Sequence, residues 1–205
     1  MPKIIDPATR RATFAEAAAR TLGRYGLGRL TLREVAKEAG FSPGLIRHYF
    51  ENQEDLLVEA CRWVHRRQAG RFLVAVGGGG GMGILERSLA SLLPLDEERA
   101  DDWRVRLALP NPGNSPGPLA AMEAASQNAL VAQIAKLLRK SSDLGELRSD
   151  IQHDEQALAL AALVTGLATS HHFAPETFGT ETLRTALRSY LRNLAIGTSS
   201  TAFEE

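Results

Sequence analysis

Apolar residues recur at helical spacing along nearly the whole chain, and the alternation typical of β-strands is absent. Phe14, Ala18 and Leu22 form one such face near the N-terminus, and Leu183 and Leu187 begin another near the C-terminus. The pattern predicts an all-α protein of about nine helices. Three short helices crowd the N-terminal quarter, and the longer ones follow.

Residues suited to capping helix N-termini mark where the early helices begin: Asp6, Thr31, Ser42 and Asn52. Glu34 completes a capping box with Thr31, and Pro43 takes the first helical position after Ser42. Gly40 lies between the two short helices that these caps predict. This is the spacing of a helix-turn-helix unit, in which a first helix holds a second one at an angle.

The remaining pattern predicts a long helix from residue 53 to about 76, and then further helices at about 82–93, 96–109, 119–140, 154–173 and 180–196. We expect the run Gly77–Gly81 to be a mobile linker and Pro110–Pro118 to be a loop. The dinucleotide-like spacing of glycines in that run follows a helix rather than a strand, so we expect it to be accidental. The predicted domains are 1–52 and 53–205.

Charge is distributed unevenly although the net charge is zero. The first 50 residues hold nine Lys or Arg and four Asp or Glu, an excess of five positive charges, and the rest has an excess of five negative charges. Such asymmetry favours an N-terminal end that meets a polyanion. A chance distribution is the alternative.

The composition indicates where in the cell the protein is expected. No apolar stretch of about 20 residues occurs, and the N-terminus lacks the apolar centre of a signal peptide, so we expect a cytoplasmic protein without a membrane partner. Cys61 is the single cysteine, which excludes an internal disulfide, and we expect it to be buried and inert.

The second helix of the helix-turn-helix unit can lie in a DNA major groove with its N-terminal residues nearest the bases. Small residues at its start permit close approach, Arg47 can reach a guanine or a phosphate, and His48 and Tyr49 can donate to phosphates. The predicted DNA-binding residues are Thr31, Arg33, Ser42, Pro43, Gly44, Arg47, His48, Tyr49 and Asn52. A plain three-helix core with solvated charges is the alternative.

Residues 31–50, TLREVAKEAGFSPGLIRHYF, followed by NQEDLL at 52–57, closely resemble the DNA-binding domain of TetR-family transcriptional regulators. The resemblance implies an all-helical homodimer whose C-terminal domain dimerises and usually holds a small-molecule pocket. An effector in such proteins typically changes the separation of the two recognition helices. Two positions depart from the family pattern: Gln53 replaces a frequent phosphate-binding lysine, and Arg47 stands where much of the family has an aromatic residue.

The C-terminal part resembles the BetI-type subgroup in the segment LLPLDEERADDWRVRLAL and in ALVTGLA with FAPE beyond it. This resemblance implies dimerisation through the last two helices, at about 154–196. The helix at 154–173 is apolar on nearly every side, which favours burial against both its own core and a partner. Aromatic residues that could cage a quaternary ammonium are few, so we do not expect choline as the ligand.

Apolar residues of the middle helices are the candidate lining of an effector pocket: Trp103, Leu107, Met122, Leu163, Leu167 and Thr169. A filled helical core fits the same pattern equally well. His171 and His172 point about 100° apart on a helix, so a shared metal ion is not expected. The sequence also shows no nucleophile with an adjacent base and no phosphate loop, and we expect neither an enzyme nor a cofactor.

The sequence therefore predicts a DNA-binding transcriptional regulator, a ligand-responsive repressor that binds a palindromic operator as a homodimer. Its expected partners are double-stranded operator DNA, a second copy of the chain and an unknown small-molecule effector. The alternative is a DNA-binding regulator whose core is filled and which responds to no small molecule.

Overall fold

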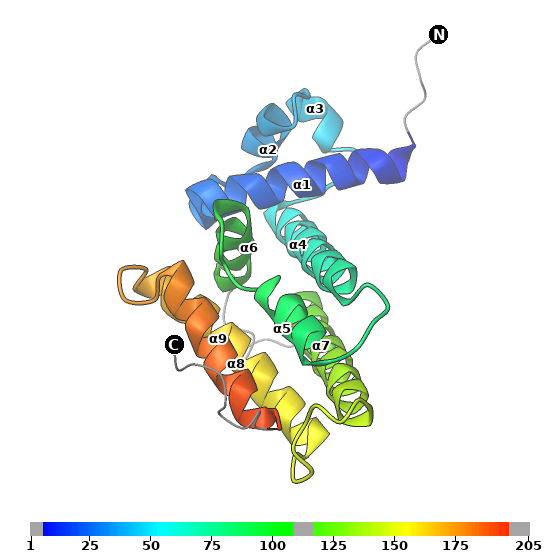
Figure 1. The fold of residues 1–205 in the computed structure, drawn as a ribbon. Helices are drawn as coiled ribbons and strands as arrows, with labels where there is room; N and C mark the ends of the chain where they lie inside the picture. The colour runs from blue at the N-terminus through cyan, green and yellow to red at the C-terminus, as the bar shows by residue number, and fades with distance from the viewer. Residues whose placement is uncertain (1–5, 109–116, 197–205) are drawn as a thin grey trace. The chain divides into compact units, whose positions relative to one another are not determined.

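The computed structural model describes residues 6–108 and 117–196, and this part of the chain confirms the predicted all-α class (Figure 1). Its α-helices and one short 3₁₀ helix, η1, have these bounds: α1 (Pro7–Tyr25), η1 (Leu27–Arg29), α2 (Leu32–Glu38), α3 (Pro43–Ile46), α4 (Gln53–Val76), α5 (Met82–Ala90), α6 (Glu97–Leu107), α7 (Pro118–Asp143), α8 (His153–Phe173) and α9 (Thr180–Leu194). No described helix combines the length and the apolarity that crossing a bilayer requires.

The chain forms two compact units. Unit 1 comprises Met1–Ala69 and Asp96–Ala124, and unit 2 comprises Gly70–Leu95 and Ala125–Glu205. This division by packing differs from the predicted boundary at residues 52 and 53, because the first part of α4 packs on the same core as α1 and α6 also packs against α1. The predicted division into a DNA-binding domain, 1–52, and a ligand-binding and dimerisation domain, 53–205, stays a prediction.

The core of unit 1 is built around Phe14 of α1, which is fully buried. Three rings surround it, with centroid separations of 5.5 Å to Phe41, 5.6 Å to Tyr49 and 6.1 Å to Phe50. Edge-to-face and tilted contacts of this kind stabilise a core beyond the area that they bury. This aromatic cluster fixes α2, α3 and the start of α4 on α1 (Figure 1).

All four predicted N-terminal caps are confirmed. The side chains of Asp6, Thr31, Ser42 and Asn52 accept hydrogen bonds from the backbone amides three residues later, at 2.9–3.3 Å. Gly40 has a φ of 76°, a conformation that glycine adopts without strain. The α-helical part of α3 covers only Pro43–Ile46, and a turn continues to Phe50.

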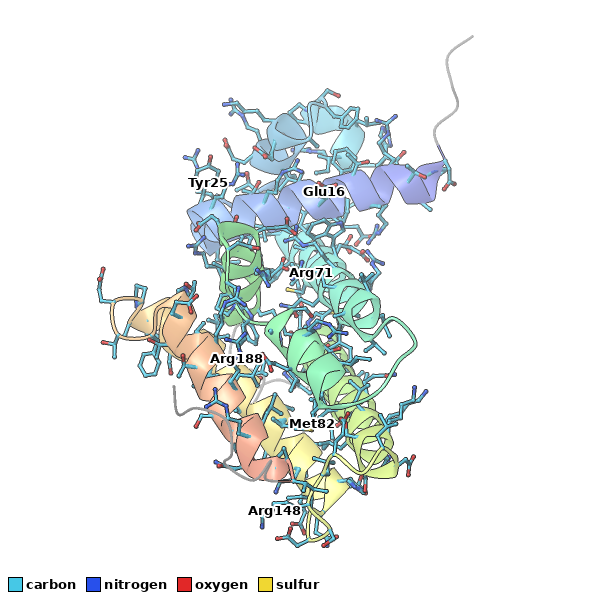
Figure 2. The ribbon with its side chains drawn as sticks, viewed as in Figure 1. Glu16, Tyr25, Arg71, Met82, Arg148 and Arg188 are labelled. Atoms are coloured by element: carbon cyan, nitrogen blue, oxygen red, sulfur yellow. The ribbon has the colours of Figure 1, made fainter. Side chains whose placement is uncertain are left out.

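Unit 2 contains α5, α8, α9, the end of α4 and most of α7. Helix α9 packs on both α5 and α8, and Arg188 of α9 donates to Glu86 of α5 at 2.7 Å (Figure 2). Helix α9 ends at Leu194 rather than at about 196, because Ala195 is extended and pairs with Leu147 in an isolated antiparallel bridge.

The glycine run is an anchored turn, and the expectation of a mobile linker does not fit its contacts. Lys140 donates from Nζ to the carbonyl oxygen of Gly79 at 3.0 Å, and Glu146 accepts from the amide of Met82 at 2.5 Å. Figure 2 labels Met82 at the start of α5. Gly81 has a φ of 103°, and a Cβ there would lie 3.0 Å from the Glu146 carboxylate. The positive φ is the reason that glycine is favoured at this position, since the Glu146 side chain could move by a few tenths of an ångström.

Three other helix boundaries differ from the prediction. Helix α5 ends at Ala90, three residues early, and turns carry the buried Leu92 and Leu93. Helix α7 begins at Pro118, which the sequence placed in a loop, and it continues to Asp143. Most of the predicted loop Pro110–Pro118 lies outside the described residues.

Candidate nucleic-acid interface

The turn between α2 and α3 is held by backbone hydrogen bonds and one partly buried aromatic ring. The amide of Phe41 donates to the carbonyl oxygen of Ala36 at 2.8 Å, and the amide of Gly40 donates to that of Lys37 at 3.1 Å. Phe41 packs on Phe14, and Ile46 is fully buried. These side chains fill the angle between the two helices, and they fix the direction of α3.

The predicted DNA-binding residues lie on the outside of this scaffold. Eight of the nine are exposed: Thr31, Arg33, Ser42, Pro43, Gly44, Arg47, His48 and Asn52. Tyr49 is half-buried, because its ring packs on Phe14 and its carbonyl oxygen accepts a hydrogen bond from Arg11. The structure therefore gathers these residues on the α2–α3 surface, while their contacts with DNA stay a prediction.

Positive charge on this surface is uncompensated. In the described chain, the exposed side chains of Arg33, Lys37 and Arg47 have no ion-pair partner. Neighbouring arginines are paired instead, for example Arg20 with Glu38 at 3.0 Å and Arg29 with Glu34 at 3.3 Å. We add Lys37 to the candidate residues. Its position four residues after Arg33, on the same face of a helix, is the signal that could have found it.

Gln53 has a structural partner. Its Nε2 donates to the carbonyl oxygen of Leu27 in η1 at 3.2 Å. The side chain that replaces the lysine of the family pattern therefore fastens η1 to the start of α4. That a phosphate contact of the family is absent here stays a prediction.

The six predicted pocket residues fall in both units. Trp103, Leu107 and Met122 belong to unit 1, where Trp103 is buried and Met122 packs against the core. The others, Leu163, Leu167 and Thr169, belong to unit 2. Thr169 donates from its hydroxyl to the carbonyl oxygen of Thr165 at 2.8 Å. The pocket that would join the six stays a prediction.

A buried polar cluster in unit 1 went undetected in the sequence. We call His65, Gln68, Arg106 and Glu123 the α4–α6–α7 cluster. Glu123 lies 2.6 Å from Nε2 of His65 and 3.1 Å from Nη2 of Arg106, and Nη1 of Arg106 donates to Oε1 of Gln68 at 3.4 Å. The i, i+3 spacing of His65 and Gln68 on the inner face of α4 is its only trace in the sequence.

The cluster sets the ionisation of the groups around it. Burial favours a raised pKa for Glu123, but the hydrogen bond with His65 and the charge of Arg106 outweigh it and hold the pKa below its ordinary value of 4.5. Cys61 is fully buried nearby, and desolvation, reinforced by the charge of Glu123, raises the pKa of its thiol to about 12. The expectation of a buried cysteine is confirmed, and the inertness of its thiol stays a prediction.

The histidine pair at the end of α8 has a structural contact. Nδ1 of His171 lies 2.7 Å from the carbonyl oxygen of Phe178, which closes the turn into α9. Among residues 6–108 and 117–196, no three side chains of the types that bind metals are assembled into a site.

Comparison with known proteins agrees with this geometry. The family of bacterial regulatory proteins, tetR family, matches residues 15–60, and the BetI-type transcriptional repressor C-terminal family matches residues 84–195. The regulator PksA of Bacillus subtilis is 27 % identical over 96 % of this chain and 95 % of its own length. A transcriptional regulator of Rhodococcus sp. Rha1 has a TM-score of 0.76 at 26 % identity, with 90 % of this chain and 95 % of that one covered.

A further similarity concerns the fold alone. The transcriptional regulator from Saccharomonospora viridis, solved in complex with choline, has a TM-score of 0.81 at 23 % identity, covering 93 % of this chain and all of that one.

The fold and the α2–α3 surface define a DNA-binding transcriptional regulator of the helix-turn-helix class. Because the C-terminal family spans more than half of the chain and the N-terminal family covers the helix-turn-helix unit, the chain belongs to the TetR family, with a C-terminal domain of BetI type.

Proposed function

We propose that the chain is a ligand-responsive repressor that binds a palindromic operator as a homodimer. Helix α3 would lie in the major groove, with Arg47 reading a base edge and the exposed residues around it contacting phosphates. The observation that carries this proposal is the uncompensated positive charge on an exposed, rigidly held α2–α3 surface. Such a regulator would act in the cytoplasm, where the chromosome is.

Operator binding can be tested by selecting fragments of genomic DNA, including those beside the protein's own gene. The selected duplex is then compared with a scrambled duplex by fluorescence anisotropy at a fixed salt concentration. Specific binding should exceed non-specific binding by a factor of at least about 1000. Equal affinity for the two duplexes at moderate salt would contradict the proposal.

Dimerisation through α8 and α9 is supported by apolar residues that α8 leaves uncovered in one chain. Leu158 is 60 % exposed and Phe173 is 76 % exposed, and Ala162 and Gly166 lie between them on the exposed side of the helix. Exposed apolar surface of this kind is typical of an interface between subunits. Two copies of the α8–α9 pair would cover it in a four-helix arrangement.

The matched test replaces two leucines that are equally exposed. Leu158→Asp should convert the dimer into a monomer in multi-angle light scattering, because a charge would be buried in the interface. Leu144, which is 61 % exposed but lies outside α8 and α9, provides the control substitution Leu144→Asp. A dimer that survives both substitutions equally would exclude α8 as the interface.

The effector response is the second part of the proposal. The supporting features are the BetI-type C-terminal family and, within unit 1, two apolar side chains predicted to line the pocket: Trp103, which is buried, and Met122, which packs against the core. The choline bound to the Saccharomonospora viridis relative shows that one protein of this fold holds a small molecule. We do not extend choline to this chain, since it has few aromatic residues to cage a quaternary ammonium.

A regulator with a filled core that responds to no small molecule is the second candidate. A thermal-shift screen against metabolites separates the two, because any ligand that binds only the native state raises the melting temperature. A compound that raises it and also weakens operator binding supports the effector response.

A further inference from the structure

Two hydrogen-bond donors in the α4–α6–α7 cluster have no acceptor in the described chain: Nε2 of Gln68 and Nε of Arg106. Gln68 is only 6 % exposed, and the side chain of Arg106 is 10 % exposed. The hydrogen bond from Arg106 to Oε1 of Gln68 orients the amide, so its NH₂ group is the unpaired end. Buried donors are almost always paired, and each exception calls for a partner.

The neighbouring side chains indicate which chemical group could accept hydrogen bonds from these two donors. Glu123 already accepts from Arg106 and contacts His65, so the protein's own carboxylate is committed. The guanidinium of Arg106 lies 4.5 Å from the ring centroid of Trp103, the most deeply buried of the predicted pocket residues in unit 1. Because Arg106 is held between a carboxylate and an indole ring, its side chain would lose little conformational entropy on binding. Its unpaired Nε–H can therefore donate to an acceptor oxygen at a fixed position.

We propose that Gln68 and Arg106 form the polar end of the effector site and bind the carboxylate of a small organic acid. The two unpaired donors would each give a hydrogen bond to the carboxylate oxygens. The apolar body of the acid would pack on Trp103, whose ring lies against Arg106, and on Leu107 and Met122, the other predicted pocket residues of unit 1. This inference rests on the proposed effector response and adds the chemical class of the ligand.

The experiment uses the full-length protein and matched probes that differ only in their polar group. Hexanoate, octanoate and phenylacetate are compared with 1-hexanol, 1-octanol and 2-phenylethanol by thermal shift and by isothermal titration calorimetry at pH 7. At least one carboxylate should bind, and it should bind at least about tenfold more tightly than its alcohol. If all three acids fail to bind, or each binds no better than its alcohol, the proposal is overturned.

Variants locate the binding in the cluster. Gln68→Met removes the amide at nearly constant volume, and Gln68→Glu keeps the acceptor for Arg106 while replacing the donor with an oxygen. Both should weaken carboxylate binding at least about tenfold and leave alcohol binding unchanged. Gln133→Met, on an exposed position of α7 in unit 2, is the control. If both Gln68 variants fold and bind the carboxylate as tightly as wild type does, the proposed site is wrong. The unpaired donors would then be hydrogen-bonded to a buried water molecule.

Operator binding is measured on the same ligand-free proteins, so the two proposals fail separately. If wild-type protein binds a carboxylate but no operator, the assignment of function is at fault and the site stands. If operator binding is specific but no acid binds, only the assignment of the ligand class is overturned.

Discussion

Unit 1 contains arginine side chains in two contrasting environments, one exposed to solvent and one largely shielded from it. On the α2–α3 surface, Arg47 is exposed and has no ion-pair partner in the described chain. In the α4–α6–α7 cluster, the side chain of Arg106 is only 10 % exposed, donates to Glu123 and lies over the ring of Trp103. The attraction between exposed charges and DNA is weakened by salt, and each charge adds its own contribution to the affinity. A charge shielded from solvent instead interacts with a few partners at fixed positions.

This contrast separates the effects that substitutions should have. Changes on the α2–α3 surface should alter DNA binding and leave stability nearly unchanged. Changes in the cluster should alter stability, its pH dependence and ligand binding, and leave DNA binding by ligand-free protein intact.

The largest effect is expected at Phe14, because α2, α3 and α4 all depend on its ring. Phe14→Ala should lower the free energy of unfolding by about 3–5 kcal/mol and abolish operator binding. Urea unfolding followed by circular dichroism measures the first effect. Tyr25→Ala is the control, since Tyr25 lies on the same helix but is 59 % exposed (Figure 2). Similar losses in the two variants would show that Phe14 is not the centre of this core.

Glu123 tests the buried side of the contrast through pH. Its folded-state pKa lies below its ordinary value of 4.5, so its contribution to stability is complete above about pH 4.5 and is lost as pH falls through the folded-state pKa. Glu123→Gln should therefore lower stability at pH 7 by about 1–3 kcal/mol. It should also make the decline in melting temperature below pH 4.5 shallower. A decline as steep as that of wild type would mean that Glu123 is not held as a carboxylate by its neighbours.

Lys37 tests the exposed side through salt. If Lys37 contacts a phosphate, Lys37→Ala should reduce the slope of log affinity against log salt concentration by about one. The melting temperature should not change. Lys136→Ala removes an exposed lysine from α7 in unit 2 and should leave the slope as it is. An unaltered slope in Lys37→Ala would remove Lys37 from the interface.

The smallest effect concerns the thiol. Because Cys61 is buried and its pKa is raised to about 12, almost none of it is thiolate at pH 8. Ellman's reagent should therefore find no reactive thiol in the native protein and one thiol per chain in denaturant. Rapid reaction of native protein would contradict the burial of Cys61 in the core of unit 1.

The sequence predicted those parts of the fold that local chemistry determines. Caps such as Thr31 and Asn52 act on amides three residues away, so helix starts could be read directly. Helix ends were less predictable: α9 stops at Leu194 because Ala195 pairs with Leu147, almost fifty residues earlier in the chain. The anchoring of the glycine run depends on Lys140 in the same way, through a contact between distant segments.

The residues of the candidate sites differ in the same way: those within one segment were predicted, and those from several helices were not. Exposed residues within a single motif, such as Ser42 and Arg47, were predicted together because one short segment carries them. The cluster was missed because His65, Arg106 and Glu123 come from three helices, and no spacing in the sequence reveals that they meet. Charge pairing was hidden as well, because the sequence does not show that Arg20 pairs with Glu38 and Arg29 with Glu34.

The central claim is that α3 reads DNA sequence, and the most direct measurement compares Arg47→Ala with Arg62→Ala on a selected operator and on a scrambled duplex. Arg62 is an exposed arginine of α4 in the same unit, and it pairs with Glu59. Arg47→Ala should weaken operator binding by about 1–3 kcal/mol more than it weakens scrambled binding, and Arg62→Ala should keep the wild-type discrimination. If Arg47→Ala discriminates between the two duplexes as well as wild type does, α3 does not read the bases through Arg47 and the account is contradicted.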